Sequence, residues 1–374
     1  MRLNIDKTQF LKALNCADKA VPSKSAIPVL SNFKLDLNEK GLEITGTNSD
    51  LTIKATVPYM VNGKEIIRDA GYGSILVNAH LLTEIVRNVE GSMINFDVID
   101  NATAVISDGK FRSKLNCFRA EEYPDIDLEP SGITFDVRCD ALAGMVEQSV
   151  FAASSRDTRP ILAALNLEAA NGKLTATATD SARLAQKSIP LEDEETRFRC
   201  NIPARTLADI VKMFEGAEVV RISVSEQKAL FQFDRNVVST RLIPGDYPVT
   251  KSIIPERFNY YLEVNAQELL SAMRRISLLS SEKDSAVKLS MKEDGVELSV
   301  KNDLSESADE RVDTFQFNGD RLDVSFNPNF VIDAIRAVKS EDVTLCFQSD
   351  NRPFVVKNPR DDSVVELITP MRSY

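Results

Sequence analysis

The chain has 374 residues, 43% hydrophobic and 27% charged, which is the composition of a globular protein rather than a disordered one. Its net charge of −11 argues against overall attraction to nucleic acid or to anionic membranes, but it allows a local basic surface. Five scattered cysteines without a Cys-x-x-Cys pair predict reduced thiols in a cytoplasmic protein. The sequence has neither a signal-peptide core nor an apolar run of membrane-spanning length, so no membrane partner is expected.

The first third of the chain predicts two helices among short strands. A strand at 3–5 leads into a helix at 8–21, which ends at Pro22 because proline cannot continue it. The second helix is predicted at 80–89. Residues 121–125 are typical of a linker. The other expected strands are 29–37, 42–47, 51–57, 74–77, 93–98, 104–107 and 112–117.

The same order of elements recurs twice more. In the second third the expected helices are 140–153 and 205–214, and the expected strands are 133–137, 161–168, 174–179, 182–189, 198–202, 219–225, 228–233 and 237–242. In the last third the expected helices are 266–280 and 329–338, and the expected strands are 259–264, 287–291, 296–300, 321–326, 343–347, 353–357 and 364–368. The acidic segment 303–309 is predicted to be exposed or mobile.

One amphipathic helix occurs once in each third of the chain. Its copies start at residues 80, 205 and 329, which are 125 and 124 residues apart. Each copy has the i, i+3, i+4, i+7 apolar spacing of a helix with one buried face. Each copy also carries a cation directed away from that face, namely Arg87, Lys212 or Arg336. The period indicates three repeated units.

Each unit has the same order of elements: a strand, a helix, several strands, a second helix and further strands. Short turns join the strands, which indicates an α+β fold with antiparallel sheets. We therefore predict three repeated domains, each with two helices. The predicted boundaries are 1–126, 127–251 and 252–374.

The sequence singles out no catalytic site, because its 56 Asp and Glu residues are plentiful but scattered on predicted surfaces. His80 is the single histidine, and it is more typical of a solvated helix start than of a metal site with Glu84. No Gly-x-Ser-x-Gly elbow, Gly-x-Gly-x-x-Gly motif or Walker loop is present. We therefore predict no catalytic residues, no metal and no cofactor. A rival interpretation is an enzyme with its site in a cleft between domains.

The outward cations allow two interpretations. Charged faces of surface helices are usually just solvated. Alternatively, Arg87, Arg205, Lys212 and Arg336 line one positive surface that faces phosphates, while the acidic remainder of the chain faces away.

Several local motifs, in order along the whole chain, carry a family resemblance. They are Ser25–Leu30, Thr158–Leu162, Ala178–Leu184, Arg241–Pro248, Ser325–Pro328, Arg352–Phe354 and Leu367–Arg372. With these motifs the chain resembles the bacterial DNA polymerase III beta subunits, the sliding clamps.

The resemblance implies a head-to-tail homodimer whose six DNA-clamp domains form a ring around double-stranded DNA. Such a ring is a processivity factor in DNA replication. Its implied partners are a clamp loader, the replicative DNA polymerase and other proteins with a clamp-binding motif. Across the dimer contact, Leu115 should meet Leu278 and Leu279, although the alternative for these leucines is ordinary core.

The resemblance also implies a partner-peptide pocket between the second and third domains. Its carried-over residues are Leu162, Thr179, Ser181, Arg183, Leu184, Pro248, Ile253, Asn327, Phe330, Leu367, Thr369, Pro370, Met371 and Arg372. The apolar residues of this pocket would bind the anchor side chains of a short peptide motif. Arg183 and the C-terminal tail of the chain would form a polar edge. The family often has histidine where this chain has Ala182, so the resemblance implies a different peptide preference at this position.

The DNA-facing residues implied by the resemblance are Lys24, Arg156 and Arg205, with Arg87, Lys212 and Arg336. His80 stands where the family often has a cation, so its contribution at neutral pH is smaller. A second rival interpretation is a repeat-built interaction scaffold that binds peptides but does not enclose DNA.

Overall fold

The computed structural model describes residues 1–100, 102–156, 158–279, 286–301 and 306–372, which form two compact units. Unit 1 comprises Met1–Cys139 and Lys212–Leu242, and unit 2 comprises Asp140–Val211 and Ile243–Tyr374. The middle repeat contributes to both units because its strands join sheets begun by its neighbours in sequence.

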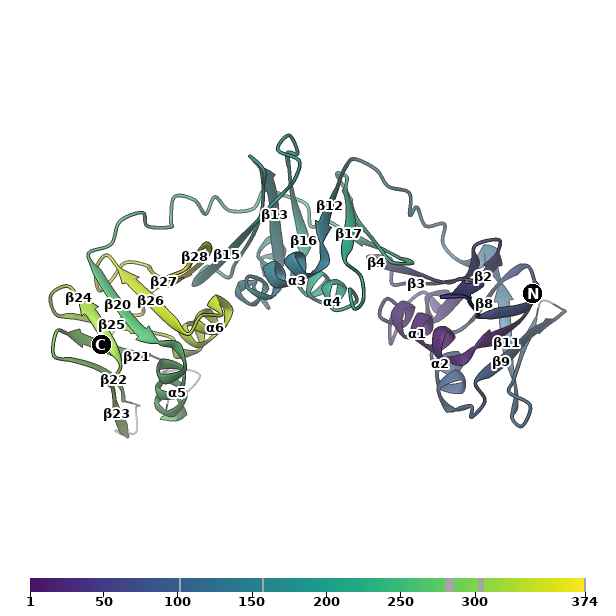
Figure 1. Cartoon of the computed structure of the whole chain (residues 1–374), viewed down its shortest axis with the longest axis horizontal. Coiled ribbons are helices and arrows are strands. Elements are labelled where there is room, and N and C mark those ends of the chain that lie inside the picture. Colours follow the sequence, from purple (N-terminus) through teal and green to yellow (C-terminus); the bar gives the residue numbers. More distant parts are fainter. Residues whose placement is uncertain (101, 157, 280–285, 302–305, 373–374) are drawn as a thin grey trace. The chain divides into compact units, whose positions relative to one another are not determined.

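All six predicted helices are present (Figure 1). They are α1 (Lys7–Asp18), α2 (Ala79–Asn88), α3 (Cys139–Glu147), α4 (Ala204–Val211), α5 (Ala266–Ile276) and α6 (Pro328–Val338). Four of them begin at an Asp or Asn whose side chain accepts a backbone N–H of the first turn. These caps satisfy donors that a helix start otherwise leaves unpaired, which is why the helices begin there.

The apolar stripe of the repeated helix is buried as predicted. In α6 all four stripe positions have at most 2% of their surface exposed, and in the other two copies only Ile85 and Val211 are partly exposed. Burying a valine, leucine, isoleucine or phenylalanine of this stripe stabilises the fold by roughly 1.5–3 kcal/mol, so the stripe fixes how the helices dock on the sheets.

Unit 1 is built on one antiparallel sheet of thirteen strands. In spatial order they are β12 (Ile133–Arg138), β17 (Val219–Val224), β18 (Lys228–Phe233), β19 (Asn236–Arg241), β4 (Leu51–Val57), β3 (Gly41–Thr47), β2 (Asn32–Asn38), β8 (Gly73–Asn78), β11 (Arg112–Arg119), β10 (Thr103–Ser107), β9 (Met93–Ile99), β1 (Arg2–Asp6) and β7 (Ile67–Gly71). A small hairpin pairs β5 (Met60–Val61) with β6 (Lys64–Glu65). The β4–β19 pairing joins the first and middle repeats into this one sheet.

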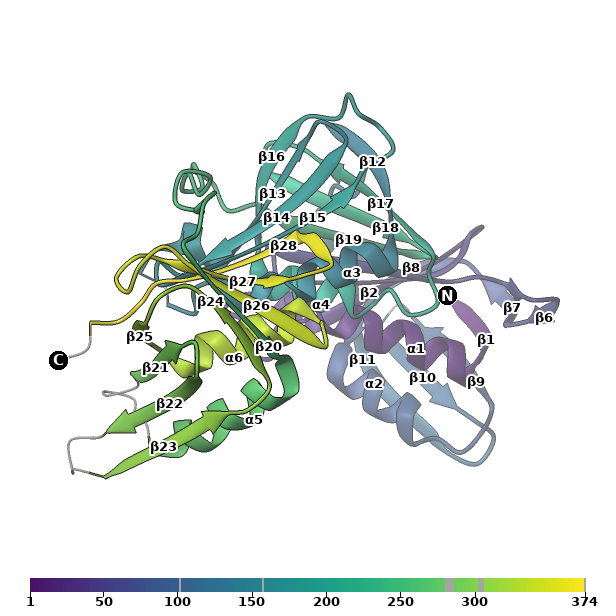
Figure 2. The same cartoon turned by 60° about the vertical axis from the view of Figure 1, so that its left-hand side comes forward.

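Unit 2 contains a nine-stranded and a four-stranded antiparallel sheet. The first runs β16 (Phe198–Pro203), β13 (Ala164–Ala170), β14 (Lys173–Thr179), β15 (Arg183–Pro190), β28 (Asp361–Ile368), β27 (Phe354–Asn358), β26 (Asp342–Phe347), β20 (Tyr260–Asn265) and β24 (Phe315–Asn318). The second runs β23 (Ser307–Val312), β22 (Gly295–Lys301), β21 (Val287–Lys292) and β25 (Leu322–Phe326), and Figure 2 shows it next to α5. The β15–β28 pairing joins the middle and third repeats.

Prolines change the predicted start of two strands. The predicted strands 29–37 and 161–168 instead begin with short 3₁₀ helices, Pro28–Ser31 and Pro160–Ala163, and the strands follow at Asn32 and Ala164. Proline fixes φ near the helical value and donates no N–H, so it favours a helical first turn over a ladder position.

Other predicted boundaries were wrong. Helix 140–153 ends at Glu147 and is followed by a separate 3₁₀ turn, Val150–Ala152. The predicted linker 121–125 is anchored, because Tyr123 is buried and its hydroxyl donates to the carbonyl of Thr45. Strands β5, β6, β7 and β24 were not predicted, since they are short or polar.

Two predicted segments fall partly outside the described residues. In the acidic segment 303–309, the residues from 307 onward begin strand β23, in which Ser307 and Asp309 are exposed as predicted, and residues 303–305 lie outside the described part of the chain. The predicted helix end at residue 280 also lies outside it, and α5 ends at Ile276.

The repeats share detail that the sequence period alone does not reveal. Ser49, between β3 and β4, has φ of 80°, and Ser181, between β14 and β15, has φ of 79°. In both turns a threonine two residues earlier, Thr47 or Thr179, donates its hydroxyl to the carbonyl four residues on. The same side-chain bonds hold both turns in a conformation that non-glycine residues rarely adopt.

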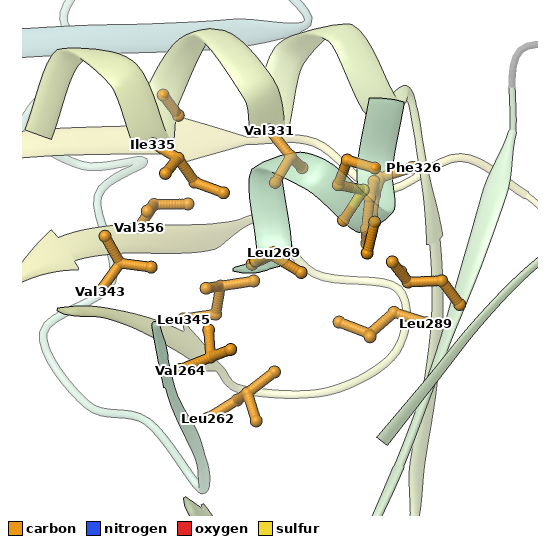
Figure 3. Close-up of a cluster of buried hydrophobic side chains, with 14 of the residues drawn as sticks. Leu262, Val264, Leu269, Leu289, Phe326, Val331, Ile335, Val343, Leu345 and Val356 are labelled. Carbon is orange, nitrogen blue, oxygen red and sulfur yellow. The ribbon is translucent and has the colours of Figure 1, made fainter. Parts of the chain in front are cut away.

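The third repeat has a continuous apolar core between its two helices and its sheets (Figure 3). Leu269 of α5 and Val331 and Ile335 of α6 point toward side chains of β20 and β26. A similar cluster in unit 1 packs under α1 and α2. Within the described residues, no helix is long and apolar enough to cross a membrane.

Candidate peptide-binding pocket and cationic surfaces

Strands β15 and β28 lie next to each other in unit 2 (Figure 1). Their residues form the floor of a pocket. Leu184 and Leu367 lie directly opposite each other in the two strands, and both are almost fully buried. They form an apolar cluster with Val355, against which Ile254 and Phe258 pack from the segment after Pro248. Two strands from different repeats therefore supply one apolar surface.

The turn between β14 and β15 forms one wall of this pocket. Ser181 donates its backbone N–H to the hydroxyl of Thr179 at 3.2 Å, and Arg183 donates its backbone N–H to Asp180 at 3.0 Å. The hydroxyl of Tyr247 accepts the N–H of Thr179 at 3.0 Å. Burial raises the pKa of Tyr247 to about 12, so it stays a neutral hydroxyl. These bonds fix the turn before any ligand arrives.

The side chain of Arg183 is fixed by several contacts with other residues of the chain. Its guanidinium donates to Asp180 at 3.1 Å, to Asp333 at 2.7 Å and to the carbonyl of Phe151 at 2.8 Å. The ring of Phe330 lies 4.6 Å from its central carbon, within the range of a cation–π contact. The positive charge is therefore already neutralised, and Arg183 shapes the pocket wall rather than offering a free charge.

The pocket has a volume of about 300 Å³. Nine of the predicted residues line it: Leu162, Thr179, Ser181, Arg183, Leu184, Pro248, Ile253, Leu367 and Thr369. Four lining residues were missed: Arg159, Ile161, Val249 and Thr250. They lie close in the chain to predicted residues, and the apolar side chain of Val249 is 76% exposed.

The remaining predicted residues lie elsewhere in unit 2. Pro370, Met371 and Arg372 line a second hollow of about 650 Å³, which also includes Arg352 and Asp323. Asn327 caps α6, and Phe330 stacks on Arg183. The segment 369–371 connects this hollow to the pocket. The N–H of Thr369 donates to the carbonyl of Ala182, and the N–H of Met371 donates to the carbonyl of Ser325.

A buried carboxyl group lies in β28 near Arg183. Glu366 is 1% exposed, and its Oε1 atom has no hydrogen-bond partner among the described residues. Burial raises the pKa of Glu366 well above its usual range, and the charge of Arg183 opposes this rise only in part. Folding therefore favours the neutral form of this carboxyl group.

We expect Glu366→Met to stabilise the protein at mildly alkaline pH by roughly 1–3 kcal/mol, the cost of an unsatisfied buried polar group. In the unfolded chain glutamate ionises above about pH 4.3, whereas the raised pKa of Glu366 keeps it protonated to higher pH in the folded protein. The wild-type free energy of unfolding should therefore fall as pH rises above that value, and the variant should lack this fall. Urea unfolding at mildly acidic and mildly alkaline pH measures the difference. Equal pH dependence in the two proteins would contradict a neutral Glu366.

The predicted DNA-facing cations are all exposed. Lys24 and Arg156 lie outside helices, Arg205 is in the first turn of α4, and Lys212 follows the last residue of α4 instead of lying within it. The side chain of Arg87 is paired with Glu84, and that of Arg336 lies 4.0 Å from Asp333. His80 is exposed in the first turn of α2.

The predicted dimer residues lie at strand edges or on the surface. Leu278, in the short 3₁₀ helix Ser277–Leu279, has 82% of its surface exposed, whereas Leu279 packs partly against the core. Leu115 is half-buried in β11. Among the described residues, the 112–116 part of β11 pairs only with β10, and β23 pairs only with β22.

No group of three or more metal-ligating side chains occurs in the described part of the chain. The five cysteines, all of them described, form no disulfide bond, and four of them are buried.

Comparison with known proteins covers the whole chain. Residues 1–127, 136–249 and 251–372 match the sequence models of the N-terminal, central and C-terminal domains of the DNA polymerase III beta subunit. The chain is 32% identical to the beta sliding clamp of Bacillus subtilis (strain 168) and 33% identical to that of Streptococcus pneumoniae serotype 4, in both cases over 100% of each chain.

Solved structures agree with the sequence matches. The crystal structure of the DNA polymerase sliding clamp from Bacillus subtilis has a TM-score of 0.96 at 31% identity, and that of the DNA polymerase III beta chain from Streptococcus pneumoniae has 0.95 at 32%. Each likeness covers 100% of both chains. The three matched domains, the two-helix antiparallel repeats and these relatives together show that the chain belongs to the DNA polymerase III beta subunit family, the sliding clamps.

Proposed function

We propose that two copies of this chain associate head to tail into a ring that encloses duplex DNA and tethers the replicative polymerase through the unit 2 pocket. The ring performs no catalytic step of its own. It acts in the cytoplasm, where a clamp loader opens and closes it around bacterial DNA. Holding DNA by enclosure needs only weak, sequence-independent contacts, which allows sliding.

The dimer proposal rests on two strand edges whose backbone groups have no neighbouring strand among the described residues. The open 112–116 part of β11 carries Arg112 and Lys114 and no acid, whereas β23 carries Asp309 and Glu310 beside one cation. An antiparallel union of these edges would satisfy backbone groups that both strands leave open. Because the two edges are different surfaces, the contact is heterologous and forms a closed assembly only if the rotation closes.

The unit 2 pocket supports a peptide partner rather than a small polar substrate. Its floor is apolar, and the partly buried cation Arg183 is neutralised by two aspartates. Such a site fits leucine- or phenylalanine-like anchors of a short extended motif. The exposed side chains of Val249 and Ile253 would be covered by such a peptide.

The experiment that tests enclosure loads the protein onto nicked circular DNA with a matching clamp loader and ATP, and then linearises the circle. We expect retention on the circle and loss after cutting, because a ring slides off a free end. Equal retention before and after cutting would instead favour the non-enclosing scaffold. Dimer formation and loader compatibility are checked in parallel by sedimentation and by the loader's DNA-dependent ATPase activity.

A further inference from the structure

We propose that Thr52, Ser239 and Asp125 exclude partner peptides from a place in unit 1 that is built like the unit 2 pocket. This place is the pairing of β4 with β19 and the turn before it, which we call the first junction. The second junction is the pairing of β15 with β28 and the turn before it, where the pocket lies. The inference rests on the proposed function and adds the residues that limit each chain to one peptide.

The turns of the two junctions have the same hydrogen bonds. In the first junction Ser49 donates its backbone N–H to the hydroxyl of Thr47 at 3.1 Å, and Leu51 donates its backbone N–H to the side chain of Asn48 at 2.8 Å. The corresponding two bonds in the β14–β15 turn of the second junction are 3.2 Å and 3.0 Å long. The two turns are therefore built alike, and their residues can be compared one by one.

The backbone contact beyond the turn also matches. Arg241 donates its N–H to the carbonyl of Asp50 at 2.8 Å in the first junction. Thr369 donates its N–H to the carbonyl of Ala182 at 2.9 Å in the second. Both junctions therefore bring strands of two neighbouring repeats together in the same register.

The side chains at the floor of the two junctions differ in polarity. In the second junction Leu184 lies opposite Leu367. In the first junction the same two positions hold Thr52 and Ser239, which also lie opposite each other and are also buried. The hydroxyl of Thr52 forms a hydrogen bond with that of Thr47 at 2.7 Å. The first junction therefore has hydroxyl groups where the second has two leucine side chains.

The rim of the two junctions differs in charge. After each junction the chain contains a buried tyrosine followed by a proline, and these tyrosines are Tyr123 and Tyr247. Two residues after Tyr247 comes Val249, an exposed apolar side chain of the pocket lining. Two residues after Tyr123 comes Asp125, which is exposed. A carboxylate therefore stands in the first junction where an apolar contact residue stands in the second.

These differences oppose the binding of an apolar anchor side chain. An anchor gains free energy in proportion to the apolar surface that it buries, and threonine and serine offer less of that surface than leucine. A peptide that covered Asp125 would also remove water from a carboxylate without supplying a partner for it. Specificity for one of two similar places then comes from unfavourable contacts at the other. The consequence is one partner peptide per chain, so partners must compete for that single site.

The test transfers the floor and rim of the second junction to the first. The background variant is Ile253→Asp, in which the unit 2 pocket is disabled. The transplant adds Thr52→Leu, Ser239→Leu and Asp125→Val to this background. Fluorescence anisotropy with a fluorescein-labelled peptide that carries leucine and phenylalanine anchors gives the dissociation constant of each full-length protein. The background should bind at least about 30-fold more weakly than the wild type, and the transplant at least about 10-fold more tightly than the background.

A matched control makes the same kinds of substitution elsewhere in the unit 1 sheet. It adds Thr134→Leu, Ser107→Leu and Asp97→Val to the background, and these positions lie in β12, β10 and β9. The control should bind the peptide like the background, because additional apolar surface alone does not recreate the floor. A transplant that binds no better than the control would overturn the proposal. Calorimetric titration of the wild type should give one peptide per chain, and two per chain would also overturn it.

The two kinds of failure can be distinguished. A wild type that does not bind the peptide would overturn the proposed function of the unit 2 pocket. A wild type that binds, with loss in the background and no recovery in the transplant, would overturn this inference alone. Circular dichroism checks that the transplant folds. If it does not, a conservative transplant with Thr52→Val, Ser239→Ala and Asp125→Val replaces it and should bind at least about 3-fold more tightly than the background, and no gain would overturn the proposal.

Discussion

Leu278→Asp should convert the dimer into monomers, raising its dissociation constant by at least about 100-fold, or about 2.7 kcal/mol. The side chain is 82% exposed in the single chain, so the substitution costs the monomer fold little. In a head-to-tail dimer the same position would place an unpaired carboxylate in an apolar contact. Sedimentation velocity across a concentration series measures the change, and retention on circular DNA should be lost with it.

The control is Met60→Asp in β5, which changes an exposed apolar residue of unit 1 to the same carboxylate. It should leave the dissociation constant unchanged. Leu115→Asp should weaken the dimer as well, and the double variant with Leu278→Asp should show less than the summed effect if the two residues meet. Fully additive effects, or an intact dimer in Leu278→Asp, would place the contact elsewhere.

Ile253→Asp should weaken binding of a clamp-binding-motif peptide by at least about 30-fold, or about 2 kcal/mol. The side chain is 48% exposed at the pocket rim, where a peptide anchor would cover it and desolvate the new carboxylate. The dimer and its retention on circular DNA should not change, because the pocket and the strand edges use different residues. Isothermal titration calorimetry with the peptide measures the loss.

Ile99→Asp is the matched control for Ile253→Asp. Ile99 is 43% exposed at the end of β9 in unit 1, outside the pocket lining. The control should bind the peptide like the wild type. Equal weakening by both substitutions would indicate a general effect of charge, and no weakening by Ile253→Asp would move the peptide site away from this rim.

The helices were predictable because each has a local signature. An Asp or Asn cap precedes α1, α2, α5 and α6, and an apolar residue every three or four positions defines the buried face. The ends were less predictable, since the sequence from Asp140 to Ala153 continues to favour a helix although α3 ends at Glu147. There the 3₁₀ turn of Val150–Ala152 packs against β14 and β15, and tertiary packing decides the boundary.

The pocket residues could be located from the sequence only through motifs, since Leu184 and Leu367 are 183 positions apart. Their meeting depends on the β15–β28 register, which no local pattern encodes. The role of Arg183 also depends on the tertiary structure. The sequence predicts a cation at the pocket, but the ion pair with Asp333 shows that its charge is neutralised within the chain. The missed neighbours Val249 and Thr250 lack any periodic signal because they lie in an irregular segment.

By itself, the sequence determined the three repeats, their six helices, the α+β class and the absence of a recognisable catalytic motif, because short-range apolar spacing and capping encode these. Only the tertiary structure decided which strands of neighbouring repeats share a sheet, how Glu366 comes to be buried without a partner, and that Thr52 lies opposite Ser239. Those outcomes depend on contacts between residues far apart in the chain, where pairing register and burial, rather than local preference, set the free energy.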